Sequence, residues 1–150
     1  MARTVLFSST SGDISFPFTE TNIDDMIIGA ATPAAGTFTN LKSTGNASLS
    51  TDSGVTAFAG GGRTGAYAIT KDVTEVATVA TAADSVVLPA AVAGMQMMII
   101  NHGANAIQVF ANGTDTINTT AGATGVAQAA AAKTIYVCYA SGLWITFVSA

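Results

Sequence analysis

Charged side chains are scarce in this sequence. Asp, Glu, Lys and Arg make up 9% of its 150 residues, whereas an ordinary soluble domain carries about 25%. Ala, Thr, Gly, Ser and Asn take their place, and hydrophobic residues make up 49% of the chain. The cores of protein interfaces are depleted of charge in the same way. The composition therefore favours a protein whose surface is largely covered by neighbouring molecules, over the alternative of a small β domain with a weakly charged surface.

Basic residues are especially few. The chain has five Lys and Arg against nine Asp and Glu, and a formal net charge of −4. A nucleic-acid-binding surface needs clustered basic side chains that follow the phosphate backbone. The basic residues are instead scattered, so we expect no direct contact with nucleic acid; they are Arg3, Lys42, Arg63, Lys71 and Lys133.

Cysteine and histidine occur once each. A single Cys138 excludes an internal disulfide and any metal site built on cysteine pairs. It lies in an apolar run, which predicts a buried, unreactive thiol. His102 stands between Asn101 and Gly103, a sequence typical of a surface turn, and no nucleophile or orienting acid is arranged around it as catalysis requires.

Two further patterns formally match active-site motifs. Residues 60–65 fit G-x-G-x-x-G, but a nucleotide-binding loop opens a helix, and here the following residues read as a strand. The acidic pairs Asp24-Asp25 and Asp72 with Glu75 come with no sign of a pocket that would shift their pKa values. We therefore predict a flexible joint and solvated acids, and a protein that is not an enzyme and needs no cofactor or metal.

Long apolar runs are also missing. No stretch approaches the roughly 20 residues of a membrane-spanning helix, and the apolar part of MARTVLFSST at the N-terminus is too short for a signal peptide. We expect no membrane partner and synthesis in a cytoplasm.

The chain divides into two parts by pattern. Residues 1–60 are irregular and rich in Ser, Thr, Gly and Ala, with apolar residues in ones and twos. Such a segment cannot form its own core, so it is predicted to be an extended arm held by contacts, or else disordered. Residues 64–150 carry repeated short strand patterns, and the glycines at 60–62 mark the predicted joint between the two parts.

The second part is predicted to be all-β. Its candidate strands are short, closely spaced and separated by turn residues, and Asn112-Gly113 is a strong hairpin signal. This spacing indicates an antiparallel β-sandwich or a jelly-roll-like module. The predicted strands are residues 66–70, 75–81, 85–88, 95–101, 107–111, 125–129, 134–140 and 143–148.

The last strands are apolar on both sides. Alternate residues of a strand face opposite ways, yet in the run 135–139 one side carries Ile135, Val137 and Tyr139, and the other carries Tyr136 and Cys138. A sheet with one wet face alternates apolar and polar residues. A second cover is therefore expected, either from other copies of the chain in a homo-oligomer or from the chain's own arm.

The arm contains a distinctive strap. Residues 22–49 read NIDDMIIGAATPAAGTFTNLKSTGNASL and carry no catalytic group. Pro33 fixes its own φ and pushes Thr32 toward extended geometry, while Gly29 and Gly36 permit turns. The core of the strap, IGAATPAAGTFTNL at residues 28–41, resembles a segment that recurs in structural proteins of tailed bacteriophages, mostly fibres and other appendages.

The second part carries another resemblance. VLPAA at 87–91 leads into GMQMMIIN at 94–101, followed by IQVF at 107–110, DTIN at 115–118 and GLW at 142–144. This succession resembles a small β module of phage head and tail decorations, over roughly residues 85–148. It departs from that pattern at 110–112, where the module often has Pro.

The two resemblances imply a structural virion protein, most simply a small decoration or cement protein on the capsid exterior. The β module would form the oligomer, a trimer by the resemblance, and the arm would grip the major capsid protein or another virion protein. The arm anchors we expect are Phe16, Phe18, Ile28, Pro33, Phe38 and Leu41. The residues we expect in module packing are Met97, Ile99, Tyr136, Tyr139 and Trp144.

Two alternatives remain open at the level of sequence. A fibre or adaptor protein at the tail or neck fits the strap, although a fibre shaft usually needs repeats and the sequence shows none. A carbohydrate-binding module would use Tyr67, Tyr139 or Trp144 as stacking surfaces, although aromatic residues make up only 7% of the chain.

Overall fold

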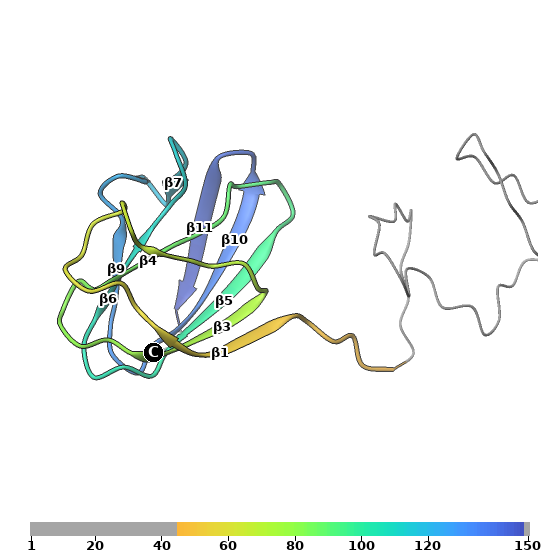
Figure 1. Cartoon of the computed structure of the whole chain (residues 1–150). Helices are drawn as coiled ribbons and strands as arrows, with labels where there is room; N and C mark the ends of the chain where they lie inside the picture. The colour runs from red at the N-terminus through yellow and green to blue at the C-terminus, as the bar shows by residue number, and fades with distance from the viewer. Residues whose placement is uncertain (1–44, 149–150) are drawn as a thin grey trace, which may run out of the picture. The chain divides into compact units, whose positions relative to one another are not determined.

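The computed structural model describes residues 45–148, and these form a β-solenoid of about 4 turns (Figure 1). Within this range the chain forms strands and no helix. The strands are β1 (Thr51–Thr56), β2 (Tyr67–Ala68), β3 (Val73–Thr78), β4 (Ser85–Val87), β5 (Gln96–Asn101), β6 (Ile107–Phe110), β7 (Thr116–Ile117), β8 (Thr120–Ala121), β9 (Val126–Gln128), β10 (Lys133–Ala140) and β11 (Leu143–Val148).

The strands form two sheets. The larger, which we call sheet A, has the order β1-β3-β5-β10-β11-β7-β8, and the smaller, sheet B, has the order β2-β4-β6-β9. The first six strands alternate between the two sheets, because each connection carries the chain across to the other sheet. Of these six, β1, β3 and β5 therefore stack in sheet A, and β2, β4 and β6 stack in sheet B.

The stacked strands of the first three turns run parallel. In sheet A, Thr51 of β1 pairs with Val73 of β3, which in turn pairs with Met98 of β5. In sheet B, Tyr67, Val86 and Val109 pair in the same manner across β2, β4 and β6. Parallel neighbours with a long connection between them are the geometry of a coil, since the chain must return to the same edge before each new strand.

The last turn runs in the opposite direction. The short antiparallel pair β7–β8 turns the chain back. After it, β9 pairs antiparallel with β6, and β10 pairs antiparallel with β5. Strand β11 then folds back on β10 and meets β7 in parallel. Figure 1 shows β10 and β11, in blue, extending sheet A beyond β5.

The predicted antiparallel sandwich or jelly roll is wrong in its topology, although the module is all-β. The sheets are mixed, and their first three turns are parallel. The turn at Asn112-Gly113 does form, with the Asp115 N–H donating to the Asn112 carbonyl over 2.8 Å. However, β6 before it belongs to sheet B and β7 after it to sheet A. It is a corner between sheets and not a hairpin.

Each of the eight predicted strands overlaps a strand of the structure, although β3 and β10 begin earlier than predicted. Three strands were not predicted: β1, β7 and β8. Because β1 belongs to sheet A, the sheet begins earlier in the chain than the predicted boundary at residues 60–64. The entry to β1 is held by Ser50, whose N–H and hydroxyl both donate to the Asp72 carboxylate, over 2.9 Å and 2.6 Å.

The core lies between the two sheets. Its largest fully buried side chains include Trp144 and Tyr136 from sheet A, with Ile107 and Val109 from sheet B. Cys138 is also fully buried, which confirms that part of the prediction for the thiol. Burying one large apolar side chain contributes about 1.5–3 kcal/mol, so these contacts between the sheets hold the coil closed.

The glycine stretch predicted to be a joint is fixed in place. Gly60, Gly61 and Gly62 all have positive φ, a conformation that glycine adopts easily. The Gly60 N–H donates to Asp84 over 3.3 Å, and the Ser85 hydroxyl donates to the Gly62 carbonyl over 2.8 Å. These bonds attach the loop to the start of β4.

Candidate interaction surface

Within residues 45–148, sheet A has one buried face and one face that no other described segment covers. In β10, Thr134, Tyr136 and Cys138 point into the core, and the residues between them point outward. The same alternation places Met97 and Ile99 of β5 inside, with Trp144 of β11. The outward side chains of β5, β10 and β11 are mostly apolar too; they are Met98, Ile100, Ile135, Val137, Tyr139, Leu143, Ile145 and Phe147.

These outward residues form rows across the strands. Met98 pairs with Ile135, and Ile135 pairs with Phe147. The next row along the strands contains Val137 between Ile145 and the polar Gln96. Paired residues of neighbouring strands have Cβ atoms about 4.5–5.5 Å apart, so the side chains merge into one continuous surface. We call this surface the apolar face.

No segment among residues 45–148 covers the apolar face. Ile135 is 37% exposed, Phe147 58% and Tyr139 59%. Exposed large apolar residues are normal singly, but a contiguous group of them marks an interaction site. A hollow of about 310 Å³ lies at one end of the face, lined by Met98, Lys133, Ile135, Phe147 and Val148.

Charge is confined to one end of this face. Glu75 of β3 and Lys133 of β10 both pair with Ile100, from opposite sides. Glu75 is already engaged, since its carboxylate lies 2.9 Å from the His102 ring and accepts the Gly54 N–H over 3.1 Å. The hydrogen bond from His102 lowers the pKa of Glu75 below its ordinary value. The face therefore presents no block of charge of one sign.

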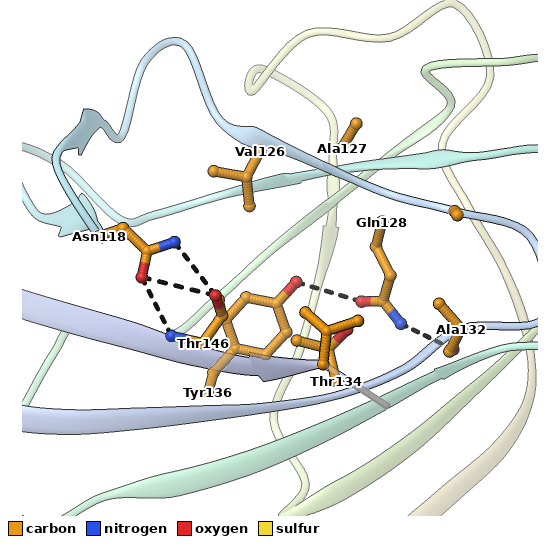
Figure 2. A pocket seen from close by; sticks show the side chains of 10 residues that line it. Asn118, Val126, Ala127, Gln128, Ala132, Thr134, Tyr136 and Thr146 are labelled. Carbon is orange, nitrogen blue, oxygen red and sulfur yellow. Dashed lines mark hydrogen bonds between the residues drawn. The ribbon is translucent and has the colours of Figure 1, made fainter. Parts of the chain in front are cut away.

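A second concavity lies between β9 and the strands β10 and β11 (Figure 2). It has a volume of about 280 Å³. Its polar groups mostly bind one another: the Tyr136 hydroxyl donates to Gln128 Oε1 over 3.1 Å, and Gln128 Nε2 donates to the carbonyls of Ile99 and Ala132. Burial raises the pKa of Tyr136.

These bonds tie β9 of sheet B to β5 and β10 of sheet A. At the other side of the concavity, Asn118 Oδ1 accepts the Thr146 N–H over 3.1 Å, as Figure 2 shows. Only the hydroxyl of Thr134 is buried here without a partner in the described part of the chain. The arrangement is a hydrogen-bonded network that links strands at a corner of the coil. Its side chains have few donors or acceptors left for a ligand.

No family model, curated protein or solved structure matches this chain.

The residues predicted for module packing divide between the two faces of sheet A. Met97, Ile99, Tyr136 and Trp144 are buried in the core of the chain itself, whereas Tyr139 lies on the apolar face. The exposed members Ile135 and Phe147 were not singled out from the sequence, although the two-sided apolar pattern of the last strands pointed to them. All six predicted arm anchors lie outside the described residues: Phe16, Phe18, Ile28, Pro33, Phe38 and Leu41.

The groups that could carry chemistry are dispersed. Among residues 45–148, no three His, Cys, Asp or Glu side chains come together as a metal site would require. His102 is a turn residue paired with Glu75, and its side chain is 53% exposed. In the same range there is no helix long and apolar enough to cross a membrane. The apolar face is thus the strongest candidate for a functional surface.

Proposed function

We propose that this protein is a structural component of a tailed-bacteriophage particle, a decoration or cement protein that binds the outer shell and stabilises it. Its mechanism is contact and involves no chemical step. The observation that carries the proposal is the apolar face of sheet A, a surface that costs free energy unless another molecule covers it. The strap at residues 22–49 supports the phage assignment, since it resembles a segment of phage structural proteins.

The proposal assigns different tasks to the two parts of the chain. The β module associates with other copies of itself, for which the resemblance implies a trimer. The arm grips the major capsid protein or another virion protein, with Phe38 and Leu41 among its anchors. Many weak contacts on one particle reinforce one another, because each bound site raises the effective concentration at the next. The place of action is the capsid exterior, after synthesis in the host cytoplasm.

The test is binding to particles that lack the protein. The variant Phe38→Ser with Leu41→Ser is compared with the native chain for the amount that co-sediments with particles. We expect retention to fall at least tenfold while the thermal unfolding of the module is unchanged, because the substitutions lie outside strands β1–β11. Leu49→Ser is the matched control: it removes one exposed apolar side chain from the segment before β1. Equal retention of the variant and native chains would eliminate the arm as the attachment site.

A tail or neck protein is the second candidate, and the fold favours it more than the sequence did. Its three parallel turns are a repeating architecture, and stacked repeats build extended molecules. Counting copies by quantitative mass spectrometry of purified particles separates the two. Hundreds of copies support the shell, and a few to a few tens support the tail or neck.

The carbohydrate-binding alternative gains no support from the aromatic residues. Trp144 is fully buried and presents no surface on which a sugar ring can stack. The hydroxyl of Tyr67 is committed to Asp52 over 2.6 Å. Tyr139 alone of the three is well exposed, and it lies among apolar neighbours on the apolar face.

A further inference from the structure

We propose that two copies of this chain pair through the apolar face of sheet A, with Tyr139 of each copy seated in the hollow beside Lys133 of the other. The inference names the partner of the module's exposed face. It replaces the trimer that the resemblance implies with a two-fold pair. It does not depend on the protein belonging to a virion, because it rests on the geometry of β5, β10 and β11 and on the charges of the chain.

The first argument is chemical. The face is apolar along three strands, so an occupant must also be apolar. The chain carries a net charge of −4, and two copies therefore repel one another over most orientations. The repulsion is weakest between two apolar faces. The charges at each face are one Glu75 and one Lys133 at the same end, and their opposite signs offset one another. A strongly acidic or basic partner finds no complementary charge there, whereas a second identical face fits.

The second argument concerns orientation. Lys133 and Tyr139 stand at opposite ends of β10, both pointing outward. Consider a two-fold axis that lies between the two faces and runs perpendicular to β10 at the level of Tyr136. This axis places Tyr139 of each copy over Lys133 of the other, so the contact occurs twice. An axis along β10 would instead bring the two Lys133 side chains together, which their like charge disfavours. The hollow of about 310 Å³ beside Lys133 offers room for a ring, and an ammonium group over an aromatic face is attractive.

The third argument concerns the affinity of the pairing, which follows from the area that it buries. Strands lie about 4.8 Å apart and rise about 3.3 Å per residue, so three strands of six to eight residues present roughly 300 Å² of face. Two such faces bury about 600 Å² before side-chain protrusion is counted, below the roughly 1,200 Å² at which stable interfaces begin. We therefore expect pairing with a dissociation constant in the micromolar range. Such a contact depends on concentration and becomes strong only where many copies are held close together.

The experiment is sedimentation equilibrium of the full chain between about 1 and 200 μM. We expect the mass to rise with concentration from 15.0 kDa toward twice that value. The variants Tyr139→Ser and Phe147→Ser should each raise the dissociation constant at least tenfold. Their thermal unfolding should change little, because more than half of each side chain is already exposed. Leu49→Ser, which removes a side chain of 60% exposure away from the face, should leave the constant unchanged.

Lys133→Gln removes the charge and keeps a polar, slightly shorter side chain. It should weaken pairing in the native chain but have no further effect in Tyr139→Ser, because the two residues act on one another. A mass of 15.0 kDa at every concentration would overturn the proposal and indicate that something else covers the face. A mass of three chains would overturn the two-fold pairing in favour of the trimer. These outcomes are separate from particle binding, which tests the proposed function.

Discussion

At the scale of single residues, Asp84 illustrates how one side chain links two segments of the coil. It lies just before β4 and is buried. Its carboxylate accepts the N–H of Thr81 over 2.9 Å, the hydroxyl of Thr81 over 2.7 Å and the N–H of Gly60 over 3.3 Å. The bond from the Thr81 N–H is the chief cause of a lowered pKa at Asp84, and the Thr81 hydroxyl adds to it.

A lowered pKa makes stability depend on pH in a definite direction. The ionised carboxylate stabilises the fold above the ordinary aspartate pKa of about 4, and this contribution is lost as the pH falls through the lower pKa of the folded state. We expect Asp84→Asn to melt at a lower temperature than the native chain at pH 7, with the difference narrowing toward pH 3. Thermal unfolding followed by circular dichroism between pH 3 and 7 measures this.

Asp52→Asn is a suitable comparison for that experiment, since Asp52 accepts from the Tyr67 hydroxyl but does not join two loops. Parallel curves for native chain and Asp84→Asn at all pH values would show that the charge of Asp84 does not stabilise the fold.

Residue types predicted local environment well where one side chain decides it. Cys138 is buried because its run is apolar, and His102 is a surface turn because Asn101 and Gly103 flank it. The sequence showed that residues 134–140 are apolar on both sides of the strand. It did not show which of the two sides the chain itself buries. That depends on sheet B, whose strands come from four separate places in the chain.

At the scale of elements, the packing of one turn on the next depends on Gly103. This residue follows β5, and a Cβ atom built on it would lie 2.5 Å from Val79 Cγ2 and 2.7 Å from the backbone nitrogen of Val79. Val79 follows β3, so the two residues occupy equivalent corners of successive turns. Glycine is needed here for close approach, since side chains do not tolerate such distances.

We therefore predict that Gly103→Ala destabilises the module by about 1–3 kcal/mol, the usual cost of forcing an extra group into a packed site. Urea unfolding measures the change. Gly45→Ala is the matched control, because no atom lies within 4 Å of the Cβ that it would add. A Gly103→Ala protein as stable as the control would mean that the turns can separate at no cost.

Element positions were predictable and their pairing was not. The strands at residues 85–87, 107–110 and 133–140 were predictable because β-branched and aromatic residues stand there between turn residues. Pairing partners lie one coil turn away, as with Val73 and Met98, and no residue pattern repeats at that distance. Two-residue strands such as β7 and β8 carry no periodic signal at all. Asn112-Gly113 correctly predicted a turn. The two residues do not determine which sheet the next strand joins.

At the scale of the whole molecule, the protection of backbone amides against hydrogen exchange should decline from the centre of sheet A outward. Strand β5 has paired neighbours on both sides, β3 and β10, whereas β1 has one neighbour, β3, within residues 45–148. The β1–β3 register is also interrupted twice, between Asp52 and Val55 and between Val55 and Thr56. An interrupted edge strand opens at lower free energy than a central one.

Native-state hydrogen exchange followed by mass spectrometry tests this order. We expect peptides from β5 and β10 to exchange slowest, and those from β1 and β2 to exchange faster by at least tenfold. Equal protection of β1 and β5 would contradict it and would indicate a further strand paired with the outer edge of β1.

The reversal of the chain at β7–β8 has a consequence for growth. A coil of parallel turns can be lengthened by any similar coil that meets its end, and two open ends permit endless stacking into filaments. Here the direction of the last turn differs from the other three, and the strands at that end of the sheets, β8 and β9, are only two and three residues long. Head-to-tail polymerisation therefore lacks a matching template at one end.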